Sequence, residues 1–312
     1  MSITVSFIST LPDLCLIKLA GEQRREYLHG QLTVATKHFD ANSARLAAHC
    51  DFKGKMFSAL IVSEFEDAFL LAAQKDAAQE SLNQLKKYGV FSKVDIAFCE
   101  DLKAYGGFGA EAFEKIKALF IDLNNTHMGA SANEFGQVIV FDDNTLRFVA
   151  YLNKEGQSRL QDLCEQEIQD QSFLFEVLEI KAGLANVQAQ TLGEFVPQML
   201  NFHALNAIDF DKGCYMGQEV VARTKFLGNN KRATFILSGL LKGDEDLAVL
   251  KVGNTLERQL GDNWRRSGII NRVSVVDKHV HLLAVMAKDT EIDSQIRIKD
   301  SDIVLEIQAL PY

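Results

Sequence analysis

The chain has 312 residues, a length typical of two or three packed units, and its 47% hydrophobic and 24% charged residues are the proportions of an ordinary globular protein. Its formal charge of -9 disfavours a protein that coats nucleic acid, because phosphate affinity comes mainly from clustered Lys and Arg. Charges interrupt every apolar stretch before the length of about 18 residues that a spanning helix needs, and the first residues lack the features of a signal peptide. We therefore expect a cytoplasmic protein.

A strand and a short helix are predicted first. Residues 13–20, DLCLIKLA, have the composition of a strand. Residues 22–30, EQRREYLHG, predict a helix whose Tyr27 and Leu28 face inward.

A hairpin is predicted next, over residues 47–60, AAHCDFKGKMFSAL, with Gly54 in a strained turn between two strands. His49, Cys50 and Asp51 are residue types that bind metals. Adjacent residues of a strand point to opposite faces, however, so we favour the hairpin over a metal site.

Helices and strands then alternate, which indicates an α+β or α/β region. One helix is predicted with Asp76 as its N-cap and with Lys86 and Lys87 in its last turn. The other predicted segments of this region are strands over 90–98, 137–143 and 146–152, and helices over 111–120, 158–168 and 172–182.

The last part of the chain has a different pattern, because short β-type runs separated by turn residues follow one another from about Lys231. These runs cover residues 233–240, 247–257, 267–277, 279–287 and 296–310. We predict a separate antiparallel unit, a small barrel or sandwich, and divide the chain into residues 1–230 and 231–312.

Cys214 is the first candidate for chemistry. The five cysteines form no CxxC pair, so neither a disulfide framework nor a self-contained metal site is predicted. Gly213 and Gly217 allow a sharp turn that presents the Cys214 thiol at a surface. If QEVVAR begins a helix, its N-terminus and nearby Lys212 favour the thiolate. The alternative is a small residue buried in a tight turn.

A local excess of positive charge is the second candidate. Residues 212–232 contain five basic residues and one acid, Glu219, within an acidic chain. This suits a small ligand with several carboxylates or phosphates. The alternative is a solvated connection between domains.

The segments KGCYMGQE and VARTKFLGNNKR together resemble the signature of the YgfZ family of folate-binding, tRNA-modification proteins, which are relatives of the glycine-cleavage T-protein. The resemblance continues in order along the chain through YLHGQLT, AAHCDFKGKM, LKKYGVFSKV, FVPQMLN, DNWRRSG and ALPY.

This resemblance implies a fold with two intertwined α/β lobes and a C-terminal antiparallel β-barrel, arranged as a ring around a central folate pocket. It implies tetrahydrofolate or a derivative as ligand, whose glutamate carboxylates would match the basic segment. It also implies an accessory role in the assembly or maintenance of iron-sulfur proteins, one of which methylthiolates tRNA. The partners would then be those proteins, with tRNA reached only indirectly.

The chain departs from the T-protein in the run after Gly54, where that enzyme has an acidic residue for aminomethyl transfer. Here the run is KMFSAL, without a carboxylate, so we expect an accessory protein more than a one-carbon transferase. A third class, direct RNA binding, is disfavoured by the acidic total. Pocket-lining tryptophans of some relatives correspond to Leu14 and Phe175, of which only Phe175 can stack on a pterin.

The resemblance also gives roles to the residues around the cysteine. Cys214 would be a reactive thiol or would supply one ligand to a cluster shared with a partner. Lys212 and Arg223 would bind ligand carboxylates or set the charge of the thiol. Two roles stay open for Tyr215, packing over the pocket or in the core, and two for Gln218 and Glu219, bonding a pterin edge or bracing the loop. Two further lysines, Lys53 and Lys55, are candidates to face the central hole.

Overall fold

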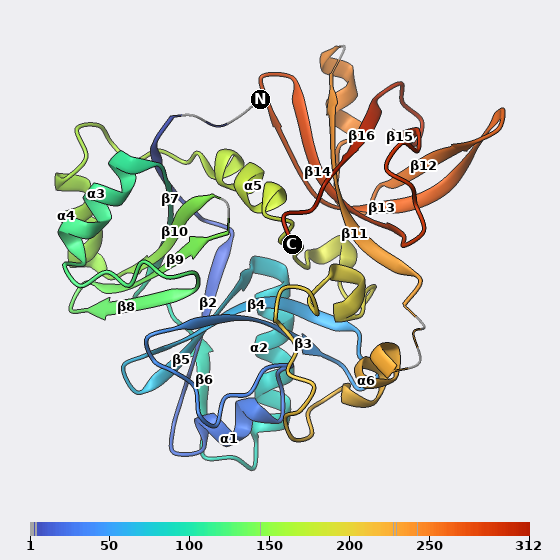
Figure 1. Ribbon diagram of the computed structural model, residues 1–312. Coiled ribbons are helices and arrows are strands. Elements are labelled where there is room, and N and C mark those ends of the chain that lie inside the picture. Colours follow the sequence, from blue (N-terminus) through green and yellow to red (C-terminus); the bar gives the residue numbers. More distant parts are fainter. Residues whose placement is uncertain (1–2, 4, 144, 227, 229, 242) are drawn as a thin grey trace.

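The computed structural model describes residues 3, 5–143, 145–226, 228, 230–241 and 243–312, which form two five-stranded antiparallel sheets and one closed barrel (Figure 1). The predicted mixture of an α/β region with a C-terminal antiparallel barrel is thereby confirmed. None of the helices within this part of the chain is long and apolar enough to cross a membrane.

The first sheet has the strand order β3-β4-β5-β2-β6. Its elements and the two helices beside it are β2 (Leu14–Ala20), α1 (Arg24–His29), β3 (Ala44–Cys50), β4 (Met56–Phe65), β5 (Ala68–Gln74), α2 (Lys75–Gly89) and β6 (Asp95–Phe98). The predicted strand 13–20, helix 22–30 and hairpin 47–60 are confirmed. Tyr27 and Leu28 are buried, and Gly54 has a φ of 70° in the β3–β4 turn.

Two predictions in this sheet are wrong in their bounds. Asp76 is not the N-cap of α2, because the helix starts at Lys75 directly after Gln74, the last residue of β5. The predicted strand 90–98 pairs with β2 only from Asp95 onward. The residues before it turn back from the end of α2, where the amide of Ser92 donates to the carbonyl of Gly89.

The second sheet has the order β1-β7-β10-β9-β8. Its elements and helices are β1 (Phe7–Thr10), β7 (Lys103–Phe108), α3 (Ala110–Leu119), β8 (Gly129–Asn133), β9 (Gly136–Asp142), β10 (Leu146–Leu152), α4 (Lys154–Asp162) and α5 (Ser172–Lys181). Because β1 pairs with β7 while the strands between them form the other sheet, the two lobes are intertwined. The predicted helix 158–168 is displaced, since the Asn153 side chain caps α4 from its N-terminal end.

A connection with little regular structure links the lobes to the barrel. It contains the short 3-10 helices η1 (Ala189–Thr191) and η2 (Pro197–Leu200) and then α6 (Gln218–Phe226), the helix predicted after Cys214. In Figure 1 α6 lies at the lower right, below the barrel.

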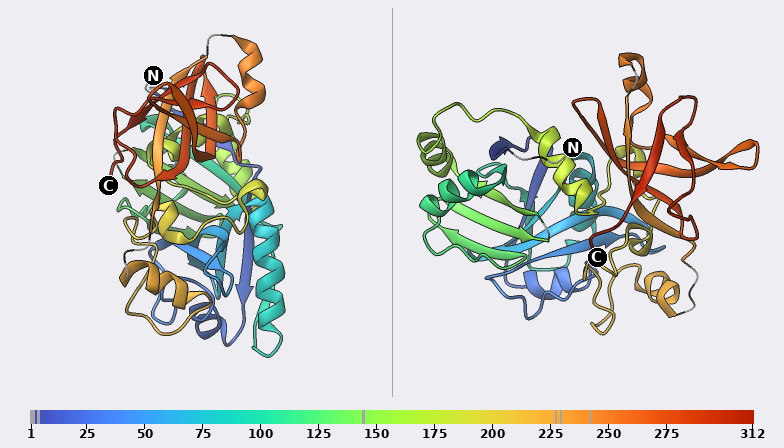
Figure 2. Two further views of the ribbon diagram at one scale, coloured as in Figure 1. Left: turned by 90° about the vertical axis from the view of Figure 1, so that its right-hand side faces the viewer. Right: turned by 45° about the horizontal axis from the view of Figure 1, so that its top comes forward.

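The barrel closes in the order β11-β14-β13-β12-β15-β16. Its elements are β11 (Arg232–Leu240), η3 (Asp244–Val249), β12 (Thr255–Leu260), β13 (Asn263–Val276), β14 (His279–Ala287), β15 (Ile296–Ile298) and β16 (Val304–Gln308). The predicted strand over 247–257 is wrong in its first half, which is 3-10 helix and turn. Figure 2 shows the barrel as a body beside the two sheets. The domain boundary after residue 230 stays a prediction.

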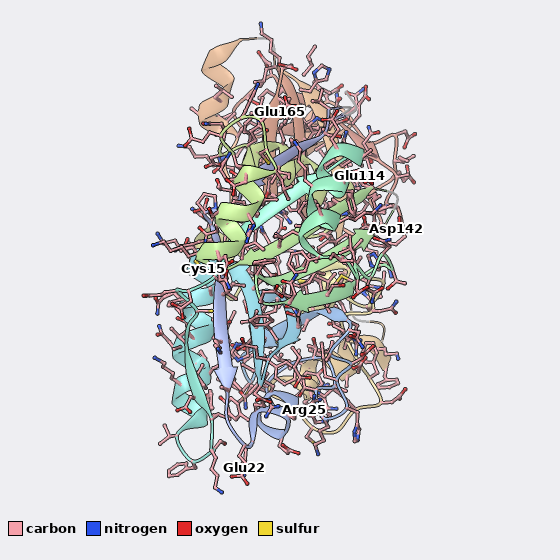
Figure 3. All side chains as sticks on the ribbon, turned by 90° about the vertical axis from the view of Figure 1, so that its left-hand side faces the viewer. Cys15, Glu22, Arg25, Glu114, Asp142 and Glu165 are labelled. Carbon is pink, nitrogen blue, oxygen red and sulfur yellow. The ribbon has the colours of Figure 1, made fainter. Side chains whose placement is uncertain are left out.

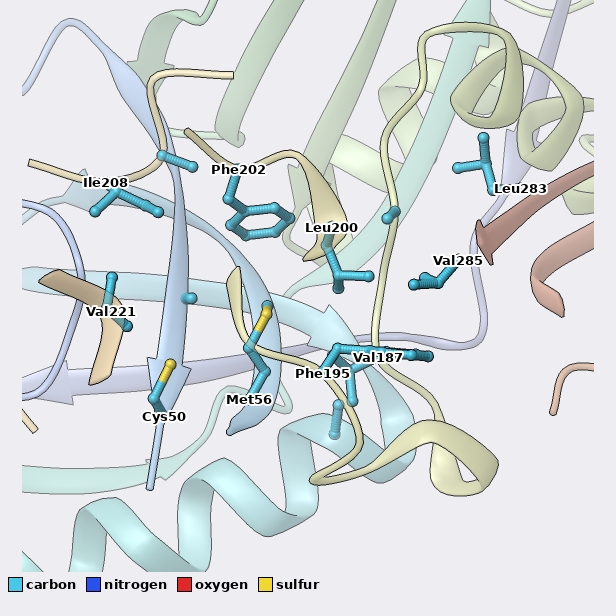
Figure 4. Close-up of a cluster of buried hydrophobic side chains, with 14 of the residues drawn as sticks. Cys50, Met56, Val187, Phe195, Leu200, Phe202, Ile208, Val221, Leu283 and Val285 are labelled. Atoms are coloured by element: carbon cyan, nitrogen blue, oxygen red, sulfur yellow. The ribbon is translucent and has the colours of Figure 1, made fainter. Parts of the chain in front are cut away.

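One hydrophobic cluster crosses all these parts (Figure 4). Met56 comes from β4, Phe195 and Phe202 from the connection, Val221 from α6 and Leu283 from the barrel. Burial of such side chains is worth about 1.5–3 kcal/mol each, so this cluster is a main source of attachment between lobes and barrel.

Candidate functional site

A cavity of about 490 Å³ lies where the two sheets, α5 and the barrel meet. A smaller hollow of about 70 Å³ adjoins it, and the two share five lining residues: Leu14, Ile61, Gln74, Glu179 and Arg272. Volumes of this order suit a small organic ligand. This central cavity is the candidate site.

Two residues expected to line a pocket do line this cavity. Leu14 stands at the start of β2, and Phe175 projects from α5. A Cβ atom at Gly106 on β7 would lie 2.6 Å from the Phe175 ring, so a glycine is needed where β7 passes behind the ring. The buried Phe175 ring is therefore held in place as one wall of the cavity.

A buried network of charges forms another wall. The Nε of Arg272 on β13 donates to Glu176 at 2.7 Å, and the same guanidinium reaches the carbonyl of Leu184 at 2.7 Å. Glu179, one turn further along α5, accepts from Arg147 Nε at 2.9 Å and is 3.5 Å from Arg272. Buried arginines are stable only with such partners, so α5 joins the second sheet to the barrel through two carboxylates.

Asn186 adds an unsatisfied donor to the smaller hollow. Its backbone groups exchange hydrogen bonds with the Asn271 side chain, and its Oδ1 accepts a 3.4 Å bond from Gln188. The buried Nδ2 has no partner among the described residues. A buried amide donor without an acceptor is costly, and a ligand oxygen would remove that cost.

The cavity-facing part of β4 carries no carboxylate. Ala59 and Ile61 line the smaller hollow. The neighbouring Ser58 points away into a buried hydrogen-bonded group, where its Oγ is 2.6 Å from Ser81 Oγ and His49 Nδ1 is 3.0 Å from the same atom. Burial lowers the pKa of His49 to about 3. This strand therefore offers no general acid or base to the cavity.

The segment around Cys214 lies elsewhere in the molecule. The Cys214 side chain is exposed, and it is absent from the described residues that line the central cavity. The amide of Met216 donates to Gly30 at 3.0 Å, so the loop is fixed to the end of α1 just after the cysteine. The structure thus brings Leu14 and Phe175 together and separates them from the predicted thiol group.

Lys212 fixes the same loop from the other side of Cys214. Its Nζ donates to the carbonyls of His29, Leu32 and Val34 at 2.6, 2.6 and 2.9 Å. Burial lowers the pKa of Lys212 to about 7, although three acceptors are fully matched only by the three donors of an ammonium group. An ion pair with ligand carboxylates would require one of these bonds to break.

The other predicted site residues, in the Cys214 segment and in the β3–β4 turn, also lie away from the central cavity. Tyr215 is buried in the hydrophobic cluster of Figure 4. Glu219 and Arg223 form an exposed ion pair of 3.6 Å on α6, with Gln218 at its start. Lys55 donates to the carbonyl of Glu194 at 2.6 Å. Lys53 is exposed in the β3–β4 turn.

The sequence did not identify three charged residues of the cavity, Glu176, Glu179 and Arg272, or the amide of Asn186. The first two stand three positions apart on a predicted helix, and Arg272 interrupts an apolar strand pattern. Charged residues within otherwise apolar segments could have indicated buried and paired charges.

Another cavity, of about 620 Å³, lies on the outer side of β2 and is lined by Cys15 and Cys99. Figure 3 shows this side of the molecule, with Cys15 labelled. Burial raises the pKa of both thiols, which keeps them protonated and unreactive. Among the described residues, no three His, Cys, Asp or Glu side chains converge to hold a metal ion.

Comparison with known proteins covers nearly the whole chain. The family model for the YgfZ beta-barrel domain matches residues 230–301. The tRNA-modifying protein YgfZ of Klebsiella pneumoniae (strain 342) is 36% identical over 307 residues, which cover 98% of this chain and 92% of that protein. The protein of the same name from Shigella boydii serotype 4 is 35% identical, with 98% and 93% covered.

The crystal structure of the glycine cleavage system aminomethyltransferase T from Bartonella henselae has the same fold. It superposes with a TM-score of 0.76, covering 98% of this chain and 86% of that chain. At 15% sequence identity, the match concerns the fold alone.

Proposed function

The chain belongs to the YgfZ family, whose compared members are called tRNA-modifying proteins, and on that premise we propose that it binds a reduced folate in the central cavity and supports tRNA modification. It acts in the cytoplasm as an accessory protein in the assembly or maintenance of iron-sulfur enzymes. One such enzyme adds the methylthio group to tRNA.

The folate proposal rests on two observations: Phe175 forms a wall of the larger cavity, and Asn186 Nδ2 is an unsatisfied donor in the adjoining hollow. A pterin has a flat ring, several N–H donors and a carbonyl acceptor. Phe175 offers a stacking surface, the Glu176 and Glu179 carboxylates offer acceptors, and Asn186 offers the donor. Leu14 packs against the ring without stacking.

Cys214 carries the proposed role in the assembly or maintenance of iron-sulfur enzymes. Its exposure on a loop fixed by Lys212 and Met216 lets it meet a partner protein instead of the folate. There it supplies a reactive thiol or one ligand to a shared cluster. Folate binding and thiol chemistry are thus assigned to separate places.

Calorimetric titration of tetrahydrofolate into the full chain tests the first half. Phe175→Leu keeps an apolar side chain of similar size but loses the stacking surface, so affinity should fall about 10-fold. Phe91→Leu, at a fully exposed ring, is the matched control and should bind as the wild type does. Absence of saturable heat with the wild-type chain would reject folate as the ligand.

The second half is tested by the activity of iron-sulfur enzymes in cells that carry only Cys214→Ala. Unchanged folate binding together with reduced enzyme activity is expected. Full enzyme activity would remove the assigned role of the thiol and leave the folate result standing.

The alternative function is a folate-dependent one-carbon transferase, which is favoured by the fold shared with the aminomethyltransferase. The apolar β4 positions Ala59 and Ile61 count against it, because aminomethyl transfer needs acid-base help. Catalytic turnover of a methylene- or aminomethyl-tetrahydrofolate by the purified chain would reverse the choice.

A further inference from the structure

Two exposed phenylalanines stand on neighbouring elements, the β3–β4 turn and α6, and Figure 1 labels the helix. Phe52 in the β3–β4 turn is 69% exposed, and Phe226 at the end of α6 is 73% exposed. A single exposed ring needs no explanation. These two rings differ from scattered exposed side chains in two ways. The elements that carry them pack against each other, and each ring has a cation beside it.

The turn and the helix are fixed against each other. A Cβ atom at Gly54 would lie 3.0 Å from the side chain of Val220, and one at Gly217 would lie 2.5 Å from the carbonyl of Asp51. Asp51 Oδ1 accepts the amides of Lys53 and Lys55 at 2.8 Å, which sets the shape of the turn. Both rings are therefore carried by one packed support.

Each exposed ring has an ammonium group beside it. Lys53 Nζ is 5.4 Å from the centre of the Phe52 ring. Lys225 Nζ is 5.6 Å from the centre of the Phe226 ring and 3.7 Å from that of Phe210. We call the set formed by Phe52, Lys53, Arg223, Lys225 and Phe226 the α6 face.

The α6 face is positive in a negative chain. Exposed Lys231 and Arg232 follow it at the start of the barrel, while the chain as a whole carries -9. Glu219 is the one acidic residue within 212–232, and it pairs with Arg223 at 3.6 Å. The charge of this surface therefore complements a polyanion.

We propose that the α6 face binds a single-stranded segment of RNA, with bases stacked on Phe52 and Phe226 and phosphates held by Lys53 and Lys225. Every base offers a flat face, so aromatic side chains between cations bind single strands without reading their sequence. The choice of RNA rests on the proposed role in tRNA modification. The residues of the face belong neither to the folate cavity nor to the Cys214 thiol.

The pairing of each ring with a cation favours a nucleic acid over an acidic protein. Protein interfaces concentrate their energy in a continuous apolar centre with a polar rim. On the α6 face each ring instead stands next to its own cation, Lys53 beside Phe52 and Lys225 beside Phe226. Bases and phosphates alternate along a single strand in the same manner.

This inference replaces the expectation that tRNA is reached only indirectly. The acidic total that disfavoured RNA binding is an average over the surface, whereas phosphates respond to charge within about 10 Å. Binding that depends on a few cations is weak at physiological salt and strong at low salt.

Fluorescence anisotropy of the full chain with a labelled oligouridylate of about 10 nucleotides is the direct test, because strands of this length match known single-strand sites. We expect saturable binding at about 50 mM salt that falls steeply by about 200 mM. Phe52→Ala and Phe226→Ala should each weaken binding about 10-fold. Lys225→Gln should weaken it and lower the salt dependence by about 0.7 in the logarithmic slope.

Phe91→Ala is the matched control, because Phe91 is likewise an exposed ring on a turn but lies just after α2, outside the α6 face. It should bind RNA as the wild type does. An equal loss in Phe91→Ala would overturn the proposal, as would the absence of saturable RNA binding at low salt.

Further binding measurements compare single-stranded RNA with other polyanions. An RNA duplex of the same length, the corresponding single-stranded DNA and a polyglutamate should each bind less tightly than the oligouridylate. Equal binding of polyglutamate with the same sensitivity to Phe52→Ala would assign the face to an acidic protein and reject RNA.

Discussion

Glu179 links two walls of the central cavity. It receives hydrogen bonds from Arg147 and Arg272, which come from the second sheet and from the barrel. Both guanidinium groups are buried, so their charge must be matched inside the protein. Each keeps one further carboxylate, Asp143 or Glu176.

Changing Glu179→Gln should lower the free energy of unfolding by about 3 kcal/mol, near the lower end of the cost of breaking a buried ion pair. The loss stays near that end because both arginines retain a second partner. Urea denaturation measures it. Glu219→Gln removes the carboxylate of an exposed pair and is the control with little effect. Equal stability of the two variants would contradict the importance given to the network.

His49 makes the stability depend on pH. Its folded pKa is about 3, because burial disfavours the charged ring, whereas an unfolded histidine has a pKa of about 6.5. Below a pH of about 6.5, His49 binds a proton in the unfolded chain but stays neutral in the folded chain. The free energy of unfolding should therefore fall as the pH drops from about 6.5 toward 3, by at most about 1.4 kcal/mol per pH unit.

Unfolding by urea at pH 7, 6 and 5 tests this in the wild-type chain and in His49→Gln. The variant should lose part of the slope even if its overall stability is lower. His38→Gln, at an exposed site, is the matched control substitution. Parallel curves for His49→Gln and the wild type would show that another group titrates.

At this scale the sequence could predict only part of the site. Leu14 and Phe175 were placed at a cavity by resemblance, and the structure puts both there. Glu179 and Arg272 could not be paired, because they are far apart in sequence and only the docking of α5 on β13 brings them together. The separation of Cys214 from the cavity likewise depends on how the connection folds.

At the scale of elements, α6 is held against the neighbouring β3–β4 turn. Gly217 precedes the helix with a φ of 81°, and its Cα faces the carbonyl of Asp51 and the backbone of Gly54. A side chain there would collide with main chain, which cannot rotate away. The position of the helix and of the Cys214 loop is set by this contact.

Gly217→Ala should reduce the free energy of unfolding by more than the roughly 1–2 kcal/mol that a left-handed alanine costs. Gly228→Ala is the matched control, because Gly228 has a φ of 64° and nothing within 4 Å of an added Cβ. The difference between the two variants measures the contact between turn and helix. If both lose the same stability in urea denaturation, that contact does not constrain α6.

Element prediction from sequence succeeded where local patterns decide and failed at boundaries set by tertiary pairing. The strand 146–152 and the helix 172–182 match β10 and α5 closely. The strand predicted from residue 90 begins at Asp95, because β2 offers partners only from there. Asp76 was wrongly predicted as the N-cap because α2 begins at Lys75, directly after the last residue of β5. No local sequence pattern indicates such a direct connection.

For the whole molecule, the cluster in Figure 4 argues against independent halves. Ile236, Leu283 and Val285 of the barrel are buried against Phe195 and Phe202 of the connection. A cut at the predicted boundary would expose these apolar surfaces to water. The barrel is a distinct sheet, but its attachment is part of the core.

A chain ending at residue 230 should therefore bind a hydrophobic dye strongly and self-associate, in contrast to the full chain. Fluorescence and sedimentation velocity measure the two effects. Cooperative unfolding of this shortened chain as a monomer would contradict the view that the barrel completes the core.

The carbonyl cage around Lys212 has a consequence for chemical labelling. A lysine whose pKa burial lowers to about 7 is an uncharged amine for a larger fraction of the time near neutral pH than an exposed lysine is, and it would react faster with an acylating reagent if it were open. Enclosed by His29, Leu32 and Val34, it reacts only when residues 212–216 lift from α1. Mass spectrometry can compare the acylation rate of Lys212 with that of exposed Lys251. The ratio of the two rates then measures how often the loop that carries Cys214 opens.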